Sequence, residues 1–158
     1  MELFIDSVDI ADIRKAVAIG VISGCTTNPK LAALAEPGDF RHRVEEILGI
    51  IPGPISVEVV AEQIDDMLCE AEEYAAWHER VVVKIPMSLE GLEVVAKLER
   101  ERDIRVNVTC MVNTNQATIA MIAGASYVSL FVGRINDLGD DADAVLQQTA
   151  HSIDRGGF

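Results

Sequence analysis

Two kinds of segment alternate six times along this chain, and this alternation restricts its possible folds more than any other feature. Short apolar runs rich in valine and isoleucine predict strands, and several are apolar throughout, as buried parallel strands are. These runs lie at residues 3–5, 21–22, 55–60, 81–85, 104–108 and 127–132. Segments of helical periodicity separate them, at residues 9–18, 30–48, 63–78, 89–102, 113–123 and 140–154. The order predicts an α/β fold with a parallel sheet and right-handed crossovers.

Several of the expected helices carry a start signal. Ser7 precedes the first, Asp39 precedes the second half of the second, and Ser88 precedes the fourth. Their side-chain oxygens can accept a hydrogen bond from a backbone N–H of the first turn. Glu90 in the first turn of the fourth helix adds a favourable interaction with the helix dipole.

Length and charge exclude several classes of protein. The 158 residues fit one domain, which we expect to span 1–158. With 26 acidic and 13 basic residues, the net charge of −13 argues against binding to nucleic acid or to an anionic membrane. The N-terminus does not resemble a signal peptide, and no uncharged apolar run reaches membrane-spanning length, so we expect a soluble, cytoplasmic protein.

The three cysteines, Cys25, Cys69 and Cys110, are far apart and lack the spacing of a zinc site. We interpret them as reduced, buried thiols.

The alternation alone is compatible with either an open doubly wound sheet or a (β/α) barrel. No Gly-rich dinucleotide fingerprint or Walker loop is present, which disfavours the nucleotide-binding open sheets. Polar residues instead lie at the ends of the expected strands. In a barrel they would converge on the C-terminal face, where barrel enzymes carry their chemistry. They are Asp6, Thr26, Thr27, Asn28, Glu58, Lys84, Asn107, Thr109, Ser129 and Arg134.

Lys84 interrupts the aliphatic run at 81–85, where an ammonium group is costly unless it is paired or deprotonated. A neutral amine in apolar surroundings can attack a carbonyl carbon, as Schiff-base catalysis requires. Alternatively, Lys84 reaches solvent or pairs with Glu58 in a purely structural role. The run by itself favours neither interpretation.

Schiff-base chemistry also needs a positioned acid or base. Asp6 and Glu58 are the candidates, since both interrupt apolar runs and we expect both on strands next to that of Lys84. The structural alternatives are a helix cap for Asp6 and a solvated edge-strand residue for Glu58.

Five motifs occur in the order and spacing of the transaldolases. They are Gly24-Cys25-Thr26-Thr27-Asn28-Pro29, Ser56-Val57-Glu58-Val59, Val82-Val83-Lys84-Ile85-Pro86 followed by Glu90-Gly91-Leu92, Val106-Asn107-Val108-Thr109 and Phe131-Val132-Gly133-Arg134. The chain therefore resembles the short, barrel-only subfamily that includes fructose-6-phosphate aldolase. The resemblance implies a (β/α)8 TIM-barrel-type fold.

The resemblance also implies roles for individual residues. Lys84 matches the lysine that forms a Schiff base with a ketose phosphate, and Asp6 matches the residue that takes the proton of the C4 hydroxyl. Glu58 matches a carboxylate that acts through a bound water, which Thr109 helps to hold. The implied substrate-binding residues are Thr26, Asn28, Asn107, Ser129, Phe131 and the phosphate-binding Arg134. The expected partners are fructose 6-phosphate, sedoheptulose 7-phosphate, erythrose 4-phosphate and glyceraldehyde 3-phosphate, with no metal or organic cofactor.

Two positions separate the activities within the subfamily. The transaldolases resemble this chain in having a carboxylate at Glu58 and a phenylalanine at Phe131, where fructose-6-phosphate aldolase has glutamine and tyrosine. The resemblance thus favours a transaldolase of the pentose phosphate pathway over the alternative, fructose-6-phosphate aldolase-type cleavage.

Only six of the eight β/α units of a complete barrel are present, and such barrels typically have about 250 residues. Relative to the family, the chain is short at its C-terminal end. It could be a truncated form, it could be completed by another subunit, or it could be a non-catalytic assembly or binding protein. An open arc of strands would leave two parallel edges exposed, which is an aggregation hazard. The resemblance to the short transaldolases, which form pentamer-based rings, implies a homo-oligomer.

Overall fold

The computed structural model describes residues 2–28, 33 and 40–156. Six parallel strands form one sheet in the order β1-β2-β3-β4-β5-β6. The strands are β1 (Leu3–Asp6), β2 (Ile22–Thr26), β3 (Ile55–Glu58), β4 (Val81–Pro86), β5 (Val106–Met111) and β6 (Tyr127–Leu130). The helices are α1 (Ile10–Ala18), α3 (Phe40–Leu48), α4 (Ile64–Ala75), α5 (Leu89–Glu101), α6 (Thr114–Ala123), α7 (Val132–Asp137) and α8 (Ala142–Gly156).

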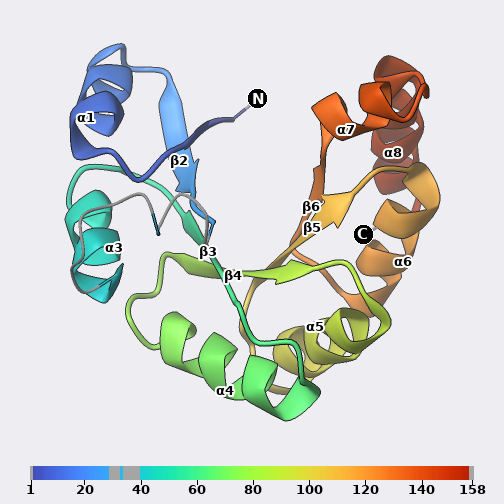
Figure 1. Cartoon of the computed structure of the whole chain (residues 1–158), viewed down its shortest axis with the longest axis horizontal. Coiled ribbons are helices and arrows are strands. Elements are labelled where there is room, and N and C mark those ends of the chain that lie inside the picture. Colours follow the sequence, from blue (N-terminus) through green and yellow to red (C-terminus); the bar gives the residue numbers. More distant parts are fainter. Residues whose placement is uncertain (1, 29–32, 34–39, 157–158) are drawn as a thin grey trace.

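The sheet curls into an arc, with the helices on its outer side and its open side between β1 and β6 (Figure 1). Every strand pairs with the next one along the chain, as the successive units of a (β/α) barrel do. The predicted α/β fold of barrel type, with six β/α units present, is therefore confirmed.

The convex face of the sheet carries the hydrophobic core. Alternate strand residues point toward the helices and form two clusters of buried side chains. The first cluster contains Ile13, Cys25, Val44, Ile47, Leu48, Ile51, Ile55, Val57 and Val81. The second contains Val59, Met67, Leu68, Ala71, Val83, Ile85, Val94, Val95, Leu98, Val106, Val108, Met111, Ala117 and Ala120. Each fully buried aliphatic side chain contributes roughly 1.5–3 kcal/mol, so these clusters fix which residues face the other way.

Two aromatic rings reach across the concave face from opposite edges of the sheet. Phe4 on β1 and Tyr127 on β6 meet edge to face, with ring centroids 6.4 Å apart. Phe4 lies directly over Gly24 on β2, where a Cβ atom would come within 2.3 Å of the ring. The glycine therefore lets this ring occupy the interior of the arc.

The helix starts agree with the sequence in part. Ser88 caps α5 as predicted, because its hydroxyl accepts a hydrogen bond from Gly91 N at 2.8 Å. The prediction for Ser7 is wrong: Asp9 is the N-cap of α1, and the hydroxyl of Ser7, two residues before it, accepts a hydrogen bond from Asp9 N. Asp39 lies outside the described residues, as do most of the residues of the expected helix 30–48 that precede α3.

Two further expectations are corrected by the structure. The apolar run 127–132 predicts a single strand, but β6 ends at Leu130 and a short helix, α7, begins at Val132. Of the three thiols, Cys25 is buried, whereas Cys69 and Cys110 are exposed. Cys69 lies on α4, and Cys110 lies at an irregularity in β5. In the described part of the chain, no helix is both long enough and apolar enough to cross a membrane.

Candidate active site

Lys84 lies on the concave face of β4 with only 6% of its surface exposed. Its neighbours Val83 and Ile85 are in the second hydrophobic cluster, so strand alternation directs Lys84 to the opposite side. The amine reaches Glu58 on β3, with 3.1 Å between Nζ and Oε2, and also donates a hydrogen bond to Thr27 O at 3.2 Å. Lys84 therefore does not extend to solvent, and of the two structural alternatives only pairing with Glu58 occurs.

The register of the sheet brings this pair together. Glu58 is the direct partner of Lys84 in the β3–β4 ladder, and its side chain is only 13% exposed. Two opposite charges at this depth lose most of their hydration, and their attraction offsets that loss only because the geometry is close. The pair thus places an amine and a carboxylate in contact inside the arc, as acid–base chemistry at an amine requires.

A hydrogen-bonded series crosses the concave face next to this pair. Asn107 on β5 is the ladder partner of Lys84, and its amide is 4% exposed. Asn107 Nδ2 donates to Ser56 Oγ at 3.1 Å, and Ser129 Oγ donates to Asn107 Oδ1 at 2.7 Å. Both predicted residues, Asn107 and Ser129, therefore belong to one network, together with Ser56, which was not predicted as a site residue.

Asp6 lies farther from Lys84 than expected. The sequence placed Asp6 and Lys84 on neighbouring strands, but β2 and β3 separate β1 from β4. The carboxylate of Asp6 accepts a hydrogen bond from Thr26 Oγ1 at 2.8 Å, within the β1–β2 ladder. It is therefore not a helix cap, and it faces the interior of the arc with Thr26.

Thr109 and Cys110 lie at the carboxyl end of β5. The Thr109 hydroxyl is buried and has no hydrogen-bond partner of ordinary geometry among the described residues, although it lies close enough to influence the Cys110 thiol. Between Val108 and Met111 the strand register shifts, and Cys110 has a φ of 63°. This irregularity brings Cys110 within electrostatic reach of Glu58 and Lys84.

Burial raises the pKa of the Cys110 thiol, and the negative charge of Glu58 raises it further, although Lys84 and Thr109 act in the opposite direction. The thiol is therefore protonated at neutral pH.

The remaining predicted residues lie at the rim. Asn28 is half-buried and directly follows Thr27, the residue whose carbonyl accepts from Lys84. Phe131 is 39% exposed and joins β6 to α7. Arg134 projects from α7 with 73% of its side chain exposed, and its nearest charged partner is Asp137, at 3.4 Å. Among the described residues, Arg134 has no contact with the Lys84–Glu58 pair.

A carboxylate outside the predicted set anchors the segment that follows Glu58. Glu70 on α4 accepts hydrogen bonds from Val60 N at 3.0 Å and Ala61 N at 2.9 Å, and Tyr74 donates its hydroxyl to the same side chain. Burial and the bond to Glu70 raise the pKa of Tyr74. A cavity of about 500 Å³ opens beside this segment, between the loops that follow β3 and β4.

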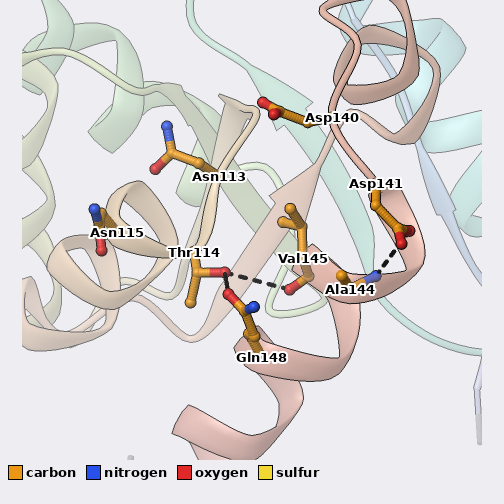
Figure 2. Close-up of a pocket in the computed structure, with 8 residues that line it drawn as sticks. All are labelled: Asn113, Thr114, Asn115, Asp140, Asp141, Ala144, Val145 and Gln148. Atoms are coloured by element: carbon orange, nitrogen blue, oxygen red, sulfur yellow. Dashed lines mark hydrogen bonds between the residues drawn. The ribbon is translucent and has the colours of Figure 1, made fainter.

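A second cavity, of about 350 Å³, lies where α6 and α8 begin (Figure 2). The Thr114 hydroxyl is directed to Val145 O and Gln148 Oε1, at 3.4 and 3.3 Å, and the carboxylate of Asp141 accepts from Ala144 N. The Thr114 contacts join α6 to α8, whereas the Asp141 contact lies at the start of α8 itself. No set of three or more His, Cys, Asp or Glu side chains within the described ranges is arranged to hold a metal ion.

Comparisons with known proteins agree with this geometry. The family model described as Transaldolase/Fructose-6-phosphate aldolase matches residues 3–156. The chain belongs to this family. A probable transaldolase of Desulforudis audaxviator (strain MP104C) is 50% identical over 154 residues, which cover 98% of this chain and 71% of the relative. A probable transaldolase of Symbiobacterium thermophilum is 44% identical over 158 residues, covering 100% of this chain and 72% of the relative.

A third relative, the probable transaldolase of Pelotomaculum thermopropionicum, is 46% identical over 155 residues, or 98% of this chain and 71% of the relative. The chain therefore spans a little over seven-tenths of the length of these transaldolase-family proteins. Membership of the family supports an activity of the aldolase or aldol transferase class.

Proposed function

We propose that this protein is a transaldolase that transfers a dihydroxyacetone unit between sugar phosphates through a Schiff base on Lys84. The observation that carries the proposal is the Lys84 amine itself, buried on the concave face at 3.1 Å from the Glu58 carboxylate. An amine held there can exchange its proton with the adjacent carboxylate, and it becomes a nucleophile when it is neutral.

In the first half-reaction, the neutral amine of Lys84 attacks the keto carbon of the ketose phosphate and a C–N bond forms. Glu58, acting through a water held by Thr109, supplies the proton with which the former carbonyl oxygen leaves as water. Asp6 then accepts the proton of the C4 hydroxyl, and the electrons of the C3–C4 bond move toward the iminium nitrogen. This cleavage releases an aldose phosphate and leaves an enamine on Lys84.

In the second half-reaction, the enamine carbon attacks the aldehyde carbon of an acceptor aldose phosphate. The new alkoxide takes the proton held by Asp6, and addition of water to the iminium releases the product ketose and regenerates the amine. Acid and base roles reverse between the two halves, as microscopic reversibility requires.

The donor and acceptor substrates that fit this scheme are fructose 6-phosphate, sedoheptulose 7-phosphate, erythrose 4-phosphate and glyceraldehyde 3-phosphate, which belong to the pentose phosphate pathway. Neutral groups can bind sugar hydroxyls without a competing charge, and they include Thr26, Asn107 and Ser129 on the concave face and Asn28 at its rim. Arg134 would bind the phosphate as a planar guanidinium, exchanging its exposed contact with Asp137 for the phosphate oxygens.

Phe131 and Glu58 favour transfer over simple cleavage. A tyrosine hydroxyl at position 131 could protonate the enamine and release dihydroxyacetone, whereas a phenylalanine leaves the enamine to wait for an acceptor aldose. Release of dihydroxyacetone from fructose 6-phosphate at an appreciable rate without acceptor would instead support fructose-6-phosphate aldolase activity.

The open edges of β1 and β6 support association of this chain into a homo-oligomer, since unpaired parallel edges attract further strands. Native mass spectrometry would measure the number of subunits. We place the enzyme in the cytoplasm, where the sugar phosphates of this pathway are metabolised.

The decisive experiment traps the Schiff base. The protein is incubated with fructose 6-phosphate, reduced with borohydride and digested, and the peptide containing Lys84 is examined by mass spectrometry for a sugar-derived adduct. Lys84→Arg serves as the negative control, and the exposed Lys15 on α1 reports nonspecific glycation in the same digest. A folded sample without an adduct on Lys84 would contradict the enzymatic proposal and favour the non-catalytic assembly protein.

A further inference from the structure

Ser56 lies on the concave face of the arc, where its hydroxyl contacts the side chain of Asn107. It lies on β3 two residues before Glu58, is 3% exposed, and its hydroxyl accepts a hydrogen bond from the Asn107 amide. Its carbonyl has a separate function, because it accepts from Thr27 N and from the Thr27 hydroxyl, both at 2.9 Å. Changing the Ser56 side chain therefore removes the hydroxyl contact and leaves the backbone ladder intact.

The contacts of Asn107 show what the serine hydroxyl does. An asparagine amide has an oxygen that accepts and a nitrogen that donates two N–H bonds. Here Ser129 donates to the oxygen and Ser56 accepts one N–H, which leaves one N–H without an acceptor among the described residues. Asn107 as a whole is 4% exposed and is the ladder partner of Lys84, so the remaining N–H belongs to a buried residue next to the reactive amine.

We propose that Ser56 is a positioning residue of the active site, which fixes the orientation of the Asn107 amide so that one N–H is kept for a hydroxyl of the ketose unit bound to Lys84. The inference rests on the proposed function, because it assumes that a ketose is bound at Lys84. Ser56 acts through Asn107 and need not touch the substrate.

Loss of the Ser56 hydroxyl would free the amide on its nitrogen side. A rotation by roughly 180° about the Cβ–Cγ bond of Asn107 exchanges the amide oxygen and nitrogen, which are nearly equal in size. The rotated amide would then place an acceptor where the substrate hydroxyl needs a donor. A single neutral hydrogen bond of this kind corresponds to roughly a tenfold change in an equilibrium or rate.

The test combines two substitutions. Ser56→Ala is made in the unsubstituted protein and in the Asn107→Ala variant, which gives four proteins to compare. Two quantities are measured for each protein. They are the rate at which the borohydride-trapped adduct forms on Lys84, and kcat/KM with fructose 6-phosphate and an acceptor aldose. Ser152→Ala, an exposed serine hydroxyl on α8 that bonds only its own helix, is the matched control. Thermal unfolding of each variant shows whether it is folded.

We expect Ser56→Ala to lower kcat/KM and the trapping rate about tenfold in the unsubstituted protein and less than twofold once Asn107 is alanine. Equal losses in both backgrounds would overturn the inference, since Ser56 would then act independently of the amide. An adduct rate for Ser56→Ala equal to that of Ser152→Ala would overturn it too, while leaving the proposed function intact.

Absence of any adduct on Lys84 in the unsubstituted protein would overturn both the proposed function and this inference. Should Ser56→Ala not fold, Ser56→Cys keeps most of the side-chain volume and replaces the hydroxyl by a weak acceptor. The same four-protein comparison with cysteine then decides, with the same expected difference between the two backgrounds.

Discussion

The Lys84–Glu58 pair should be coupled in stability, which a double-mutant cycle can measure. At 3.1 Å between Nζ and Oε2, an effective dielectric constant of about 20 gives an attraction of about 5 kcal/mol. Both side chains are largely buried, so loss of hydration offsets much of this attraction, and the pair as a whole contributes little net stability. Removing one partner, however, leaves a charge in the interior with no counter-charge.

We expect Glu58→Gln to lower the free energy of unfolding by about 3 kcal/mol. This value is at the lower end of the range for removing one partner of a buried ion pair, because the glutamine oxygen can still accept a hydrogen bond from Lys84. Lys84→Met should lower it by about 2 kcal/mol, since Glu58 is the more exposed partner. The double variant removes both charges, and its stability should lie within about 1 kcal/mol of the parent.

Urea unfolding followed by circular dichroism gives these free energies, provided that the slope with denaturant is the same for all four proteins. The expected coupling between the two substitutions is about 4 kcal/mol. A double variant as unstable as the sum of the single variants would refute the reasoning, because the two charges would then be solvated separately and not paired.

Three further outcomes are expected. Gly91→Ala should lower the free energy of unfolding in urea by about 2 kcal/mol, because the added Cβ would lie 2.4 Å from the carbonyl oxygen of Pro86 at the end of β4. Gly133→Ala, whose Cβ would meet nothing within 4 Å, is the control and should be neutral or stabilising. Equal effects of the two substitutions would contradict the clash. Burial raises the pKa of the Cys25 thiol from 9.0 to about 11, so the unfolded chain loses this proton at a lower pH than the folded protein does. The stability that the protonated thiol contributes is complete below pH 9 and falls by about 2–3 kcal/mol by pH 11. The free energy of unfolding of Cys25→Ala, measured in urea, should therefore decline less steeply between those pH values. Iodoacetamide should alkylate the exposed Cys110 thiol in the native protein, and faster as the pH rises beyond 9. This alkylation should abolish formation of the borohydride-trapped adduct on Lys84. Full adduct formation after complete alkylation of Cys110 would place this thiol outside the site.

The sequence offered pairing of Lys84 with Glu58 as one alternative, because each charge interrupts an aliphatic run and a buried charge needs a partner, but only the structure distinguishes it from a lysine that reaches solvent. The sequence predicted the occurrence of six strands because apolar segments too short for helices, separated by helical periodicity, leave few alternatives. The bounds were less accurate: β2 runs to Thr26 and β5 to Met111, beyond the apolar runs 21–22 and 104–108. Ser56 was not predicted as a site residue, because a small polar residue within a strand carries little signal until its neighbours are known.

Other features depend on information that is not local. The irregularity in β5 that exposes Cys110 arises from how β5 and β6 fall into register, and no residue in the run is a glycine that would mark a positive φ. The apolar pair Phe131 and Val132 extends the strand pattern, although the chain has already turned into α7 there. Strand order places Asp6 three strands from Lys84, as the successive pairing of barrel strands requires, and the expectation of neighbouring strands was wrong.

The boundary between the two hydrophobic clusters has a consequence for cooperativity. It lies between Val57 and Val59 at the end of β3 and between Val81 and Val83 on β4, so Lys84 has the second cluster behind it, whereas Asp6 follows Ile5, which packs against the first. If the cluster that includes β1 and β2 opened first, Asp6 and Thr26 would leave the site while Lys84 kept its place. The residues proposed for the amine and for the carbon–carbon cleavage thus lie against different hydrophobic clusters, and the proposed activity requires both clusters to be folded.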